Sequence, residues 1–299
     1  MSYKKIRIAV CMYGQPRTAL YCAPWIKEFF NIPSGTHVNQ YRKNIDMVHD
    51  FISKEPFEIE IDYFLHIKDY NIYMNTIGDP DWAPNMNPVQ TVSQEYINEL
   101  IDTYKPKKYQ ILTREEERPL INPGIRNGYS AMFYSLTSAM RLKREYEIET
   151  GNLYDYCFAH RFDGIVGPDV NSLKNRFGDH GFHPMSVTTL GEMYRWKWEN
   201  WRLGPNDVFL GGDNLAMEIL FADISRIYTC NDIYKCGDDH GGPNIILGRS
   251  FGQSNIKHNA DHTMHCAIVR HRADLNIPVM ESWMYHQNFW LENHKSKLL

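Results

Sequence analysis

The segment YDYCFAHRFDG, residues 154–164, begins with a pattern typical of a buried strand and has an arginine and an aspartate near its end. Arg161 and Asp163 are two residues apart, so in an extended chain they project to the same side and either neutralise each other or share a target. An aspartate oxygen is a ligand that Mg²⁺ and Mn²⁺ accept, and a guanidinium binds phosphate oxygens. The position of the pair at a strand end favours a binding site over a structural ion pair.

A second group of candidate binding residues follows the apolar run IRIAVCMYG, residues 6–14, which is typical of a strand buried on both faces. Gly14 permits a ligand to approach the backbone closely, and Arg17 lies where a phosphate could also meet helix N–H groups. For this turn taken alone, an ordinary strand-to-helix connection with an exposed arginine is the favoured interpretation. The turn has neither the G-x-G-x-x-G pattern nor a P-loop, so it indicates neither dinucleotide nor P-loop chemistry.

Several aspartates could act as a base toward an acceptor hydroxyl. Asp207 and Asp213 flank the strand-like DVFLGGD, and Asp238 and Asp239 lie in the glycine-rich CGDDHGG. For Asp213 we predict an N-cap role, because a helix pattern begins directly after it. Asp207 and Asp239 are the candidates for the base.

Two other conspicuous patterns favour structural roles. Cys230 and Cys236 are separated by five residues, which is outside ordinary zinc spacing, so no structural zinc site is expected. The cluster RWKWENWR, residues 195–202, could stack on sugar rings or bases. Its alternation of tryptophan with charge is also what a half-buried strand shows, and we favour that interpretation.

Strand and helix patterns alternate along the chain, which predicts an α/β fold with a mostly parallel sheet flanked by helices. In such sheets ligands bind beyond the carboxyl ends of the strands, which is where the candidate residues fall. The expected strands are residues 6–14, 57–69, 107–113, 154–163 and 207–212, and the clearest expected helices are 93–106, 127–150 and 213–228.

Composition excludes several classes of protein. The 299 residues are 43% hydrophobic and 23% charged, as in ordinary globular proteins, and the net charge of −4 does not indicate duplex nucleic-acid binding. The six cysteines lack the spacing of a secreted disulfide framework, and no segment reaches the ~18 apolar residues needed to span a bilayer. We expect one domain in the cytoplasm, with reduced thiols.

The order of these motifs resembles a known family. GQPR at 14–17, the long helix pattern at 127–147, the RFD at 161–163 and the later DVFLGG at 207–212 are together similar to GT-A glycosyltransferases. The resemblance is to the bacterial, phage and giant-virus group in which R-x-D replaces D-x-D. It covers roughly residues 6–228 and rests on several motifs in the same order along the chain.

The resemblance implies a single GT-A-like, Rossmann-like domain that binds a nucleotide-sugar donor. Carried over by position, Gly14, Gln15 and Arg17 would line the nucleotide or diphosphate site. Asn127 and Tyr129 would approach the nucleoside.

The resemblance also implies a divalent cation, Mn²⁺ or Mg²⁺, bridging the diphosphate at Asp163. Arg161 stands where the family has its first carboxylate, so it would bind the diphosphate and take over part of the charge-neutralising role of the metal. A late histidine, His265 or His286, could complete the metal shell.

The expected activity is transfer of a sugar from a nucleotide-diphosphate-sugar to a hydroxyl acceptor, a glycan, with Asp207 or Asp239 as catalytic base. We expect residues 1–170 to form the donor-binding half and 171–299 the acceptor-binding half. Two alternatives stay open at this point. One is a non-catalytic carbohydrate-binding protein on a degenerate transferase scaffold. The other is a transferase acting on nucleic-acid bases, with the tryptophan cluster stacking on a flipped base.

Overall fold

The computed structural model describes eleven segments of the chain. They are residues 4–30, 57–72, 89–120, 127–166, 186–190, 192–194, 202–205, 209–229, 257–261, 266–272 and 277–281.

A seven-stranded sheet forms the centre of the molecule, in the order β12-β8-β11-β6-β1-β2-β5. Its strands are β1 (Lys4–Gly14), β2 (Phe57–Lys68), β5 (Lys108–Leu112), β6 (Tyr156–Arg161), β8 (Ser186–Leu190), β11 (Phe209–Asp213) and β12 (Lys257–Asp261). All neighbouring strands are parallel except β11, which is antiparallel to both β6 and β8. The prediction of a mostly parallel sheet in an α/β fold is therefore confirmed.

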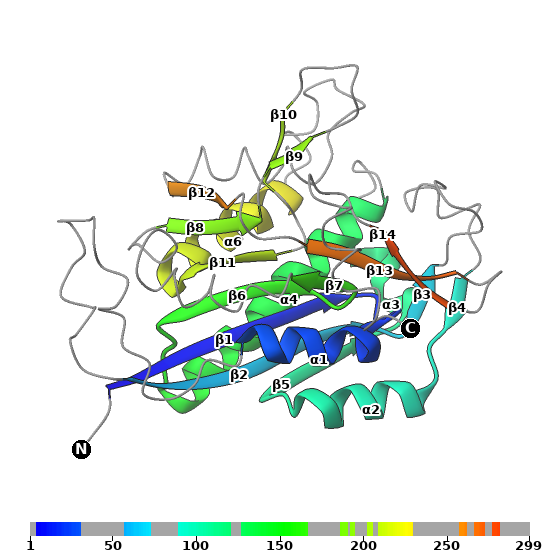
Figure 1. Cartoon of the computed structure of the whole chain (residues 1–299), viewed down its shortest axis with the longest axis horizontal. Helices are drawn as coiled ribbons and strands as arrows, with labels where there is room; N and C mark the ends of the chain where they lie inside the picture. Colours follow the sequence, from blue (N-terminus) through cyan, green and yellow to red (C-terminus); the bar gives the residue numbers. More distant parts are fainter. Residues whose placement is uncertain are drawn as a thin grey trace.

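Helices cover both faces of this sheet (Figure 1). On one face lie α1 (Ala19–Phe30) and α2 (Gln94–Tyr104), and on the other lie α4 (Asn127–Thr150) and α6 (Asn214–Thr229). A short helix, α3 (Arg114–Glu117), continues into the 3-10 helix η2 (Arg118–Leu120).

The central strand β1 shows why the sheet needs helices on both faces. Its even-numbered residues from Ile6 to Met12 pack against α1 and α2, whereas Ala9, Cys11 and Tyr13 pack against α4 and α6. All of these side chains are at most 5% exposed. Burial of each large apolar side chain contributes about 1.5–3 kcal/mol, so the continuous apolar run is explained by two buried faces.

Strand β11 requires a glycine at position 211 because the strand lies close to a ring of β6. A Cβ atom placed on Gly211 would come within 2.2 Å of the Phe158 ring. Asp213 then ends the strand, and its Oδ1 accepts a hydrogen bond from the Ala216 amide at 3.0 Å. The predicted N-cap role of Asp213 is thereby confirmed.

The remaining described strands form small sheets. These are β3 (Tyr70–Ile72) with β4 (Val89–Thr91), β9 (Glu192–Tyr194) with β10 (Arg202–Pro205), and β13 (Cys266–Arg272) with β14 (Ile277–Glu281) and β7 (Gly164–Val166). Strand β7 begins directly after Asp163, and Gly164 pairs with Ile268 of β13. The C-terminal part of the chain therefore fixes the path of the backbone just beyond the R-x-D. Of the tryptophan cluster, 195–201 lie outside the described residues.

Candidate anion-binding site at the strand ends

Three parallel strands end side by side at one edge of the central sheet. Strand β1 lies between β6 and β2, with Tyr13 opposite Arg161 and Gly14 opposite Ile67 (Figure 1). The amide of Phe162 donates to the Tyr13 carbonyl at 3.4 Å, which holds the end of β6 against β1. The two motifs that the sequence marked as candidates, GQPR and R-x-D, therefore meet.

Two arginines converge on one carboxylate at this edge. The Arg161 guanidinium binds Asp163 through two contacts, Nε to Oδ1 at 2.9 Å and Nη2 to Oδ2 at 2.9 Å. Arg17 Nη1 donates to the same Oδ2 at 3.0 Å. The side chains of Arg17 and Asp163 are 6% and 5% exposed, and that of Arg161 is 17% exposed. Charge-assisted bonds of this kind are short and strong, so the three side chains form one unit.

In the turn after β1, hydrogen bonds from both the side chain and the backbone amide of Arg17 hold this residue in place. Gly14 has φ of +106°, a conformation that favours glycine, and it turns the chain at the end of the strand. Arg17 Nε donates to Gln15 Oε1 at 3.0 Å, and the Arg17 amide donates to Asn71 Oδ1 at 2.8 Å. The interpretation of this turn as a connection with an exposed arginine is therefore wrong, because the guanidinium is buried against Asp163.

A second ion pair, which the sequence analysis missed, lies at the end of β2. Lys68 Nζ is 2.7 Å from Glu117 Oε1 and donates to the Ala131 carbonyl of α4 at 3.2 Å. The Tyr70 hydroxyl donates to the other oxygen of Glu117. A capping box between Thr113 and Glu116 fixes the start of α3, and this short helix holds Glu117 in place. The available signal was a lysine ending an apolar strand, which does not by itself reveal a partner 49 residues later.

The two ion pairs act on each other electrostatically. Burial lowers the pKa of Lys68, Glu117 opposes this effect, and the charges of Arg17 and Arg161 lower it further. We call Arg17, Arg161, Asp163, Lys68 and Glu117 the strand-end cluster. Its three cations face two carboxylates, so these five side chains carry an excess of one positive charge.

Two buried histidines lie behind the strand-end cluster. His160 Nδ1 is 2.6 Å from the Arg161 carbonyl oxygen, and burial lowers the pKa of His160 to about 4. Burial likewise lowers the pKa of His66 to about 3, and neither of its ring nitrogens has a hydrogen-bond partner among the described residues. Both imidazoles are therefore neutral at neutral pH, and neither adds charge to the site.

The other candidate residues are placed only in part. Asn127 and Tyr129 lie in the first turn of α4, the helix whose Ala131 carbonyl accepts from Lys68, but their side chains lie outside the described residues. Asp207 and Asp239 lie outside the described ranges altogether. Their predicted roles stay predictions.

The described contacts do not fit the divalent cation that the family resemblance implies at Asp163. Both carboxylate oxygens of Asp163 are bound by guanidinium groups at 2.9–3.0 Å. Among the described residues, no three His, Cys, Asp or Glu side chains lie together so that they could hold a metal ion. His265 and His286 lie outside the residues that the structure describes.

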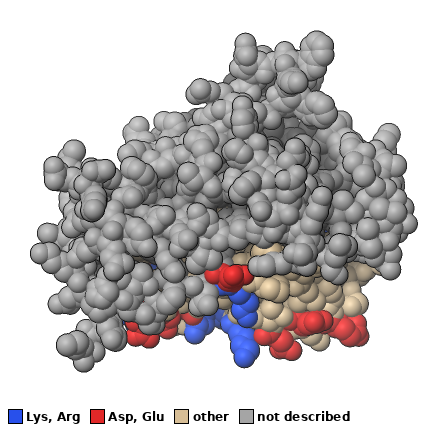
Figure 2. Space-filling view, viewed as in Figure 1, with Lys and Arg blue, Asp and Glu red and all other residues tan. Residues whose placement is uncertain are grey.

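On the face shown in Figure 2, the described surface carries both positively and negatively charged side chains. Where side chains are described on the face in Figure 2, Lys and Arg lie directly beside Asp and Glu. Of the helices in the described segments, none is both long and apolar enough to cross a membrane.

Comparison with known proteins gives distant structural similarity alone. No protein-family model matches the chain, and no curated protein matches it. Mouse xyloside xylosyltransferase 1 is similar at 12% identity and a TM-score of 0.37, over 86% of this chain and 85% of that one. The galactosyltransferase LgtC, solved with donor and acceptor sugar analogues, is similar at 14% identity and a TM-score of 0.38, over 82% of this chain and 70% of that one. Similarity at this level assigns neither a family nor an activity to the chain.

Proposed function

We propose that this protein is a GT-A type glycosyltransferase that binds the diphosphate of a nucleotide-sugar at the strand-end cluster and transfers the sugar to a hydroxyl acceptor, a glycan. The observation that carries the proposal is the convergence of Arg17 and Arg161 on Asp163 at the carboxyl ends of β1 and β6. In α/β sheets ligands bind beyond these strand ends, and guanidinium groups held there suit an anionic ligand.

Glycosyl transfer needs fixed cations at this place. The bond between the anomeric carbon and a diphosphate oxygen breaks, the acceptor oxygen bonds to the anomeric carbon, and the hydroxyl proton passes to a base. Negative charge grows on the leaving diphosphate as the bond stretches, so cations already held in place lower the barrier. Arg17 and Arg161 are held in this way by Asp163 and Gln15.

The base that accepts the hydroxyl proton is assigned to Asp207 or Asp239, as the sequence indicates. Asp207→Asn and Asp239→Asn separate the two. Loss of transfer with retained donor binding identifies the base.

The cytoplasmic location expected from the cysteine pattern belongs to the same proposal. The described thiols of Cys11, Cys22 and Cys157 are buried and form no disulfide.

A screen of nucleotide-sugars tests the activity. The protein is incubated with UDP-, GDP-, CDP- and dTDP-sugars, and release of the nucleoside diphosphate is measured. We expect one nucleotide class to be hydrolysed slowly without acceptor and faster with one, and Arg17→Met to reduce the rate. Hydrolysis of any donor would also exclude the non-catalytic alternative. If no donor is cleaved and no nucleoside diphosphate raises the melting temperature, the proposal is wrong.

A further inference from the structure

We infer that Asp163 is a positioning residue, not a metal ligand, and that the strand-end cluster binds a nucleoside diphosphate without a divalent cation. This inference rests on the proposed function. It starts from the disagreement between the metal that the family resemblance implies and the contacts that Asp163 makes.

The contacts of Asp163 are those of an arginine-holding carboxylate. Each of its oxygens accepts from a guanidinium, Oδ1 from Arg161 and Oδ2 from both Arg161 and Arg17. A Mg²⁺ ligand oxygen must come within about 2.1 Å of the ion, so a bound ion would lie against at least one guanidinium. The carboxylate is also 5% exposed, so water screens the repulsion between such cations weakly.

Cationic side chains held at the strand ends can take over the role of a metal. A divalent cation in a transferase neutralises the diphosphate and its growing charge. Arg17 and Arg161 both contact Asp163, and Lys68, which is paired with Glu117, places a third cation at the end of the adjacent strand. The positive charge therefore comes from side chains that the fold itself holds in place.

The geometry around Asp163 also keeps the two guanidiniums together. Arg161 is fixed by a two-point contact to the residue two positions later, and Arg17 is fixed between Gln15 and Asp163. Asp163 is the element that these two arginines have in common. Removal of its charge loosens the hold on both, so it weakens diphosphate binding even though it removes a negative charge from an anion site.

The effect of Asp163→Asn on diphosphate binding distinguishes a positioning residue from a metal ligand. If Asp163 were a metal ligand, Asp163→Asn would weaken binding in Mn²⁺ and leave it equal or tighter in EDTA. If Asp163 positions the arginines, the variant weakens binding in both conditions by the same factor. We expect about tenfold or more, the size of a lost hydrogen bond to a charged group.

The test measures binding of UDP, GDP, CDP and dTDP by calorimetry, to the wild type and to Asp163→Asn, in EDTA and in Mn²⁺. We expect the wild-type dissociation constants in EDTA and Mn²⁺ to agree within about threefold for the nucleotide that binds. Binding at least tenfold tighter in Mn²⁺ overturns the inference and leaves the proposed function standing. Binding of no nucleoside diphosphate in either condition overturns the proposed function itself.

Two controls keep the test decisive. Arg17→Lys keeps the charge but loses the planar fork, and we expect it to weaken binding in EDTA and Mn²⁺ alike. If Asp163→Asn does not fold, the wild-type comparison between EDTA and Mn²⁺ still decides between the two accounts.

Discussion

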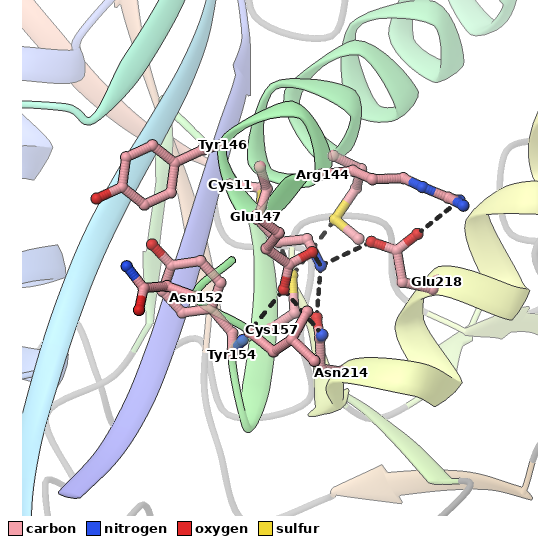
Figure 3. A network of polar contacts seen from close by, with 12 residues as sticks. Cys11, Arg144, Tyr146, Glu147, Asn152, Tyr154, Cys157, Asn214 and Glu218 are labelled. Atoms are coloured by element: carbon pink, nitrogen blue, oxygen red, sulfur yellow. Dashed lines mark hydrogen bonds and ion pairs between the residues drawn. The ribbon is translucent and has the colours of Figure 1, made fainter. Parts of the chain in front are cut away.

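Two clusters of buried charge lie at different places on the sheet, and their charges are balanced differently. The first is the strand-end cluster at the carboxyl ends of β1, β2 and β6. The second, the Lys143 cluster, consists of Lys143, Arg144, Glu147, Asn214 and Glu218 and joins α4 to α6 (Figure 3). Its Asn214 amide donates to the Asp155 carbonyl, just before β6 begins, so this cluster lies near the amino end of that strand.

In the Lys143 cluster every charge has an opposite partner. The fully buried Lys143 Nζ is 2.9 Å from Glu147 and 2.6 Å from Glu218, and it donates to Asn214 Oδ1 at 2.5 Å. Arg144 binds the other oxygen of Glu218 at 3.3 Å. Two cations therefore meet two carboxylates, in contrast to the three cations and two carboxylates at the strand ends.

The hydrogen bonds of the Lys143 cluster join separate elements. Glu147 Oε1 accepts from the Tyr154 amide and from Asn214 Nδ2, both at 3.1 Å, so α4, α6 and the segment before β6 are tied together (Figure 3). Burial by itself lowers the pKa of Lys143, but Cys157, Glu218 and Glu147 outweigh it, and its pKa lies above the ordinary value. A neutral, fully paired cluster indicates a structural role, whereas at the proposed anion site two guanidinium groups converge on one carboxylate at the carboxyl ends of the strands.

The largest expected effect is on stability, at the Lys143 cluster. Lys143→Met leaves the buried Glu147 without its cation and Glu218 with Arg144 alone, so we expect the free energy of unfolding to fall by about 3–5 kcal/mol. Urea denaturation measures this loss. A loss below about 1 kcal/mol would contradict a structural role for the cluster.

The second effect is on binding, at the strand-end cluster. Arg17→Met removes one cation but leaves Asp163 paired with Arg161, so we expect the affinity for a nucleoside diphosphate to fall about 10- to 150-fold while stability changes less than in Lys143→Met. Calorimetric titration measures the affinity. Arg144→Met, an arginine of the other cluster, is the matched control and should leave the affinity unchanged. Equal losses in the two variants would remove the distinction between the clusters.

Acid should weaken the fold through the histidines behind the strand-end cluster. The pKa of His66 is about 3 in the folded state, below its unfolded value of about 6.5, so the unfolded chain binds more protons between these values. The stability from neutral burial is therefore complete above pH 6.5 and is lost as the pH falls, by about 1.4 kcal/mol per pH unit for this one proton.

His66→Leu tests this pH dependence. Between pH 6 and 4.5 the free energy of unfolding of the variant should fall less steeply than that of the wild type, by about 1.4 kcal/mol per pH unit. Urea denaturation at several pH values gives both slopes. Identical slopes would show that His66 is not buried in its neutral form.

The smallest effect is expected at the exposed rim of the Lys143 cluster. Arg144 is 65% exposed and contacts Glu218 at 3.3 Å, while Glu218 keeps its contact with Lys143. Arg144→Met should change the free energy of unfolding by less than about 1 kcal/mol, because exposed ion pairs contribute little. A larger loss in thermal unfolding would mean that the stability of the cluster depends on this exposed contact.

The sequence predicted the meeting of Arg17 with Arg161 and Asp163 for a physical reason. Parallel strands bring their carboxyl ends to one edge, so residues that follow two buried strands become neighbours once the sheet is recognised. Arg17 is 144 residues before Arg161 in the chain, yet local strand patterns were enough to bring the two together.

The buried ion pairs could not be predicted in the same way. Periodicity gives the side of a strand or helix on which a residue lies, but not the element that packs over it. Lys143 lies in the charged part of its helix and is buried because α6 covers it. Lys68 pairs with Glu117 because α3 places this glutamate beside the end of β2. The antiparallel direction of β11 relative to β6 could not be predicted either, because a strand followed by a helix has the same local sequence pattern in both directions.

Hydrogen–deuterium exchange with the most tightly bound nucleoside diphosphate tests the central claim most directly. We predict slower amide exchange at residues 13–17 and 161–164 in the presence of the nucleotide, and no change at 143–154 and 214–218. Protection confined to the Lys143 cluster, or absent from both strand ends while the nucleotide is bound, would contradict the assignment of the strand-end cluster as the diphosphate site.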